Sequence, residues 1–100
     1  MLARIKIINI NTKAVIGIVD TLTIPADRVR LPSTGLRDKI GEEIFYKDIL
    51  TDGLYDFRVE WDKSNARFIL IYKSGGRPKK MNMHRAKLLT KTGNQYEQKR

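Results

Sequence analysis

Few side chains in this 100-residue chain have the type and spacing that catalysis requires. His84 is the only histidine and there is no cysteine, which excludes a paired histidine acid–base system, a thiolate nucleophile and a cysteine metal site within one chain. Asp38, Glu42, Glu43 and Asp48 are close in sequence, but nothing in their spacing directs them toward one point, as a hard cation requires. We therefore expect no enzymatic activity, no catalytic residue, no metal and no cofactor.

The positive charge of the chain is concentrated near its end. The net charge is +9, and residues 73–100 hold nine Lys/Arg against the single acid Glu97. Residues 1–72 are nearly balanced, with eleven Lys/Arg against ten Asp/Glu. Such a segment attracts phosphate backbones by releasing counterions, and it also attracts acidic proteins. The cations predicted to bind nucleic acid or an acidic partner are Lys73, Arg77, Lys79, Lys80, Arg85, Lys87 and Lys91.

Two further features have both a binding and a structural interpretation. Residues 74–80, SGGRPKK, could cradle a phosphate with backbone amides and cations, but they lack the Walker spacing and also fit a mobile hairpin connection. Exposed aromatic rings could stack on single-stranded bases, although aromatic residues on strands more often fill a core. The rings in question are Tyr55, Phe57, Trp61, Phe68 and Tyr72.

Short runs of β-branched and aromatic residues predict the elements that position these side chains. Residues 5–10 and 14–19 fit two strands joined by a turn, and Gly17 marks a bulge in the second strand. Another run at residues 21–24 ends at Pro25, which cannot donate to a sheet. Apolar and polar residues alternate over 54–61, and residues 54–73 therefore predict an antiparallel hairpin.

The remaining segments are less regular. Residues 31–42 contain Pro32, Gly35 and Gly41 and are interpreted as turns. Residues 43–50 fit either a helical turn or a short strand, and residues 81–89 favour a strand over a short basic helix. The sequence predicts an all-β, mainly β fold in a single domain, as an SH3-like or partly open barrel of short antiparallel strands with a basic C-terminal segment.

Nothing in the sequence predicts export or membrane insertion. No segment approaches the roughly 20 apolar residues of a membrane span. The first ten residues mix Arg4 and Lys6 with isoleucines, unlike a signal peptide. The absence of cysteine gives no indication of an oxidising compartment. We expect a cytoplasmic protein without a membrane partner or a small-molecule substrate.

Three segments, in order along the chain, resemble the YopX family of small phage and prophage proteins. The most specific is residues 34–50, TGLRDKIGEEIFYKDIL, which resembles the family segment TGLKDKNGKEIYEGDIV. The strand FRVEWD at 57–62 and the ARF that follows at 66–68 are similar to the family's VEWD strand and its partner strand. TGNQYE at 92–97 is similar to the closing IGNIYE. The chain departs from the family at Lys47, where a glycine is usual, and it lacks the RxWD opening.

The resemblance implies a β-rich, barrel-like protein made in an infected or lysogenic bacterium, and the family has no established biochemical activity. Glycines in the motif would serve turns and its isoleucines would anchor the core, which favours a structural role over an active site. The residues assigned to the motif are Gly35, Leu36, Asp38, Gly41, Ile44, Asp48 and Trp61.

A second resemblance points to a different class of protein. Residues 52–58 and 67–72 are similar to the central strands of RelE/HigB-type ribosome-dependent ribonucleases. Those proteins begin with a strand and helices, whereas the prolines and glycines of residues 14–42 are unsuited to a long helical hairpin.

Three hypotheses about function remain beside the ribonuclease alternative. The first is a non-enzymatic phage accessory protein that binds nucleic acid through its basic C-terminal surface, with little sequence preference. The second is a protein-interaction module that inhibits or modulates a host enzyme or defence nuclease. The third is a virion or assembly component, which predicts a defined homo-oligomer.

Overall fold

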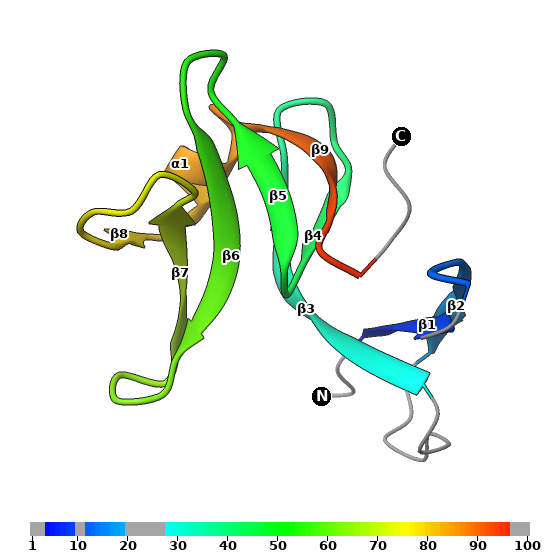
Figure 1. Cartoon of the computed structure of the whole chain (residues 1–100). Coiled ribbons are helices and arrows are strands. Elements are labelled where there is room, and N and C mark those ends of the chain that lie inside the picture. Colours follow the sequence, from blue (N-terminus) through cyan, green and yellow to red (C-terminus); the bar gives the residue numbers. More distant parts are fainter. Residues whose placement is uncertain (1–3, 10–11, 20–27, 97–100) are drawn as a thin grey trace.

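A computed structural model gives the structure of the protein and describes residues 4–9, 12–19 and 28–96 (Figure 1). These residues form two antiparallel sheets and one very short helix. The first sheet has the strand order β2-β1-β3-β4. Its strands, from β1 to β4, are Ile5–Asn9, Val15–Val19, Arg28–Arg37 and Glu43–Phe45.

The second sheet has the strand order β8-β7-β6-β5-β9 and forms a half-barrel together with the end of β3 and with β4 (Figure 1). Its strands, from β5 to β9, are Asp48–Thr51, Asp56–Asp62, Arg67–Tyr72, Lys79–Lys80 and Thr90–Asn94. The helix α1 is Met83–Ala86 and lies between β8 and β9 in the chain. The predicted all-β class is confirmed, and the described residues close only part of a barrel.

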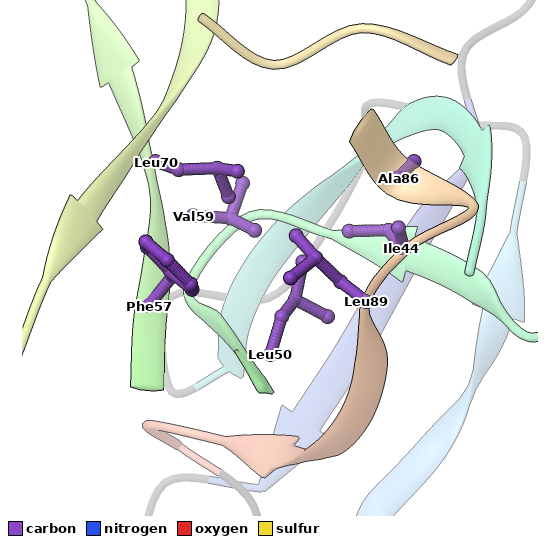
Figure 2. Packing of buried hydrophobic residues seen from close by; sticks show 7 residues of the cluster. All are labelled: Ile44, Leu50, Phe57, Val59, Leu70, Ala86 and Leu89. Carbon is purple, nitrogen blue, oxygen red and sulfur yellow. The ribbon is translucent and has the colours of Figure 1, made fainter. Parts of the chain in front are cut away.

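Two hydrophobic clusters form the core of the described part of the chain, and β4 contributes to both. Ile44 lies in the larger cluster inside the half-barrel, whereas the next residue, Phe45, lies in a smaller cluster with Ile8 and Leu31. Successive side chains of a strand point to opposite faces, so β4 separates the two clusters and packs against each of them. Figure 2 shows the larger cluster, which consists of Ile44, Leu50, Phe57, Val59, Leu70, Ala86 and Leu89.

Both predicted hairpins are confirmed. In the pair β1–β2, Ile7 faces Gly17 and Ile8 faces Val15, so the predicted bulge lies beside the glycine. In the pair β6–β7 the register is regular from Phe57–Tyr72 to Asp62–Arg67. The alternation along β6 buries Phe57 and Val59 completely or nearly so. Fully burying side chains of this size stabilises the fold by about 1.5–3 kcal/mol each.

The expectation that residues 31–42 are turns is wrong for most of that segment. The ten-residue strand β3 extends to Arg37, and only residues 38–42 turn. Pro32 has no N–H to donate, but its carbonyl still joins the strand pairing by accepting the backbone N–H of Tyr46 at 2.9 Å. Gly35 has φ +79° within an irregular part of the β3–β4 pair, so a bulge replaces the expected turn.

The other irregular segments resolve as follows. Residues 43–50, for which the sequence allowed a helical turn or a strand, form β4 and β5 around a turn at residues 46–47. The strand favoured for residues 81–89 is wrong, because α1 begins after Asn82, whose side chain accepts the backbone N–H of Arg85. The strand expected at residues 21–24 lies outside the described residues.

Candidate nucleic-acid interface

Six of the seven predicted cations lie at the surface, between the end of β7 and the end of α1. Five are exposed and Arg85 is half-buried. Among the residues that the structure describes, none of the six forms an ion pair. Their contact with phosphates stays a prediction. We name this set the basic edge, and it consists of Lys73, Arg77, Lys79, Lys80, Arg85 and Lys87.

Local turn chemistry places residues 73–80 of the basic edge at the β8 side of the second sheet (Figure 1). Lys87, after α1, lies beside Leu36 and Lys39. Gly75 and Gly76 have φ of +93° and +120°, a backbone conformation that glycine adopts without steric cost. The chain then returns as β8, which pairs with β7 as the outermost strand. Lysines on an outer strand prevent further strand pairing and keep it available to a charged partner.

Lys91 does not belong to this surface, which corrects the prediction from sequence. Its side chain is only 3% exposed. Its Nζ lies 3.1 Å from Oδ2 of Asp48 and donates to the backbone carbonyl of Glu43 at 3.2 Å. A lysine so enclosed has no route to a phosphate, and its charge serves a buried ion pair instead.

Asp48 is completely buried, and both of its carboxylate oxygens have partners. Oδ2 accepts the backbone N–H of Phe45 at 2.7 Å, and Oδ1 accepts Nδ2 of Asn94 at 2.7 Å. Burial raises the pKa of Asp48 above its ordinary value of 3.8, while the Lys91 ammonium and the Asn94 amide oppose that rise. The hydrogen bonds and the ion pair occupy this carboxylate within the core, so it presents no reactive atom at the surface.

Asp38 is also buried and organises the turn after β3. Its Oδ1 accepts the backbone N–H groups of Ile40 at 3.0 Å and Glu42 at 2.8 Å. Its Oδ2 accepts the backbone N–H of Lys91 at 2.8 Å, which ties the turn to β9. Asp38 and Asp48 therefore hold separate parts of the backbone, and both are buried.

The remaining motif residues lie mainly in turns and in the core. Gly35 and Gly41 have φ of +79° and +89°, Ile44 is fully buried, and Leu36 packs against the larger cluster. Trp61 is the exception, because it is 46% exposed. No group of three His, Cys, Asp or Glu that could hold a metal ion occurs within the described part of the chain.

Trp61 lies in a groove between the two sheets, which sequence reasoning did not find. The groove has a volume of about 490 Å³. β3 forms one wall, β6 and β7 form the other, and the turn between β4 and β5 also contributes. We name it the aromatic groove, and it is lined by Arg30, Pro32, Ser33, Tyr46, Trp61 and Phe68.

The five aromatic residues considered for base stacking have different environments. Phe57 is buried in the larger cluster, and Tyr72 packs against that cluster. Tyr55 is 54% exposed and contacts Tyr72 edge to face, away from the groove lining. Only Trp61 and Phe68 lie in the groove, where their ring centroids are 4.9 Å apart.

Neither the protein-family models nor the curated proteins compared with this chain give a match. Within the described residues, no helix is long and apolar enough to cross a membrane.

Proposed function

We propose that this protein is a non-enzymatic nucleic-acid-binding protein whose basic edge neutralises phosphates. The observation that carries the proposal is a set of six surface cations between residues 73 and 87, five of them exposed and none in an ion pair with a described residue. A cation without an internal partner gains most from a phosphate, because the contact releases the counterions condensed on the nucleic acid. Such contacts give affinity with little dependence on base sequence.

The resemblance to the YopX family supports a place for this activity among phage accessory proteins in the bacterial cytoplasm. Asp48 and Asn94, which belong to two of the matching segments, bond to each other through Oδ1 and Nδ2. Lys47, at the position where the family usually has glycine, has φ +69° and therefore a backbone conformation suited to glycine. The motif carboxylates Asp38 and Asp48 are occupied by internal hydrogen bonds, which supports a non-catalytic role.

The proposal is tested by a salt titration of binding to a short duplex. If all six cations contact phosphates, the slope of log K against log salt is about −5 for duplex DNA. Lys80→Gln is expected to weaken binding to every duplex and to make the slope less steep by about 1. Lys13→Gln is the matched control, because Lys13 is an exposed lysine in the turn between β1 and β2. Equal salt slopes for the wild type and Lys80→Gln would refute the role of the basic edge.

The competing protein-interaction module predicts a different result in host lysate. A tagged protein is used to capture partners from two halves of one lysate, one of which is treated with nuclease. Recovery that is diffuse and disappears after nuclease treatment supports the nucleic-acid proposal. Enrichment of the same host protein in both halves favours the interaction module.

A further inference from the structure

The aromatic groove contains the features of a site for an unstacked nucleobase. Trp61 and Phe68 contact each other at an interplanar angle of 71°, so the two rings support each other from neighbouring strands. This contact holds the indole in place on β6 while leaving 46% of the residue exposed. A fixed and half-exposed indole offers a flat surface on which a base can stack.

The position of Trp61 on β6 explains why it is exposed. Phe57, Val59 and Trp61 share one face of the strand, and the first two are buried in the larger cluster. Trp61 lies near the end of β6, in the groove that this strand forms with residues of β3. The only tryptophan of the chain therefore lies outside the core, in the lining of the groove.

The charge of the groove suits a nucleotide. Among the residues that the structure describes, its lining contains one cation, Arg30, and no carboxylate. Arg30 is exposed and forms no ion pair within the described residues. The two carboxylates that flank Trp61 in sequence have other partners. Glu60 pairs with Lys47 and Arg58. Asp62 accepts Nδ2 of Asn65 at 2.7 Å and the Nε of Arg67 at 3.4 Å in the turn that follows. An anion in the groove would thus meet the guanidinium of Arg30.

We infer that the aromatic groove binds a base of single-stranded nucleic acid by stacking on Trp61, with Arg30 contacting the adjacent phosphate. This inference rests on the proposed function and makes it more specific. The groove volume of about 490 Å³ lies within the range of small-ligand sites, which is roughly 300–1,000 Å³. Bases in a duplex are stacked on their neighbours and cannot enter the groove, so single strands are bound more tightly than duplexes at equal salt.

The first experiment uses the fluorescence of Trp61, which is the only tryptophan and therefore reports on this site alone. The intact protein is titrated with oligothymidylate and oligouridylate, and binding is followed in parallel by the anisotropy of a labelled oligomer. Stacking is expected to quench the fluorescence in step with the anisotropy change. Quenching by either oligomer supports the inference.

The second experiment compares variants by anisotropy alone. Trp61→Ala is expected to weaken single-strand binding by about 5- to 150-fold, the range for loss of one stacked base. Tyr55→Ala is the matched control, since Tyr55 is similarly exposed but lies outside the groove lining, and it is expected to bind as the wild type does. Circular dichroism verifies that both variants fold, and the fluorescence titration of the wild type does not depend on any variant.

The outcomes separate this inference from the proposed function. Unchanged Trp61 fluorescence during binding that anisotropy detects, with Trp61→Ala as tight as the wild type, overturns the groove site and leaves the basic edge in place. Absence of binding to both single strands and duplexes overturns both proposals.

Discussion

Lys47 has φ +69°, in the left-handed region where a side chain other than glycine is strained. Its Nζ also pairs with Glu60, at 2.5 Å from Oε1 and 2.8 Å from Oε2. Glycine and alanine at this position remove the same ion pair, but only alanine retains the strain. We therefore expect Lys47→Gly to be more stable than Lys47→Ala. The difference in free energy of unfolding, measured in urea, is expected to be about 1 kcal/mol.

A control position separates this strain from the general flexibility of glycine. Lys63 lies in the turn after β6 and does not have a positive φ. Glycine is therefore expected to be no more stable than alanine at position 63. Equal stabilities of Lys47→Gly and Lys47→Ala would show that the turn between β4 and β5 carries no strain.

The ion pair between Asp48 and Lys91 predicts a large effect from a small change. Asp48→Asn leaves the Lys91 ammonium buried without its counter-charge, and breaking a buried pair in this way costs about 3–5 kcal/mol. Chemical unfolding of the wild type and the variant measures the loss. Adding Lys91→Met to Asp48→Asn removes the stranded charge, so the double variant is expected to be more stable than Asp48→Asn alone.

The sequence indicated that Asp38, Asp48 and Lys91 could bind a ligand, because they are charged. Their structural roles depend on the partners that the fold brings to them. Asp48 receives Lys91 and Asn94 from β9, which is distant in the chain, and one sequence does not reveal that pairing. The excess of positive charge near the end of the chain therefore predicted an exposed Lys91 wrongly. The same charge pattern correctly predicted the exposure of Lys79 and Lys80, which form no ion pair with a described residue.

At the scale of elements, Asp38 connects the turn after β3 to β9. Asp38→Ala would leave the backbone N–H of Lys91 buried without an acceptor, which costs about 1–3 kcal/mol. Asp52→Ala is the control, because Asp52 accepts the exposed N–H groups of Leu54 and Tyr55, and water can replace that acceptor. Hydrogen exchange of the Lys91 amide is expected to accelerate in Asp38→Ala but not in Asp52→Ala. Equal protection in both variants would contradict the connection.

The loop before β6 and the turn after it depend on ionised aspartates. Hydrogen bonds from the backbone N–H groups of Tyr55 and Leu54 lower the pKa of Asp52, and the hydrogen bond from the side chain of Asn65 lowers the pKa of Asp62. A lowered pKa in the folded state stabilises the fold at pH above the ordinary value of 3.8. That contribution is lost as the pH falls through the lower folded-state pKa values.

The corresponding prediction concerns the variant Asp52→Asn/Asp62→Asn. Asparagine retains an acceptor oxygen but does not titrate, so the stability of the variant is expected to fall less steeply than that of the wild type between about pH 4 and pH 2. Urea unfolding at a series of pH values measures both curves. Parallel curves would mean that these two carboxylates do not contribute to acid unfolding.

The sequence was most informative where a strand is regular and half-buried. The alternation from Phe57 to Trp61 predicted β6 and its hairpin, because one buried face imposes a period of two. β3 was not predicted, because Pro32 and Gly35 are typical of turns. In the structure a bulge accommodates Gly35, and the carbonyl of Pro32 still accepts a hydrogen bond within the strand. α1 was not predicted, because four residues are too few to show a helical period.

At the scale of the whole molecule, the aromatic groove depends on the relative position of the two sheets. Arg30 lies on β3 of the first sheet, and Trp61 and Phe68 lie on the second. No local pattern links these residues, which explains why the sequence suggested exposed aromatics but not their basic neighbour. The site proposed for a nucleobase therefore exists only if both sheets fold as one unit.

That condition gives a prediction for Ile8→Ala, a change in the smaller cluster of the first sheet. Ile8 is fully buried, so its truncation is expected to cost about 2–5 kcal/mol and to lower Tm by at least about 8 °C. Trp61 reports on the second sheet, and far-ultraviolet circular dichroism reports on both. The two signals are expected to shift equally, whereas Val15→Ala on the exposed side of β2 shifts neither appreciably. A Trp61 transition that stays at the wild-type temperature would show that the sheets unfold separately and that the groove is not held by a single cooperative core.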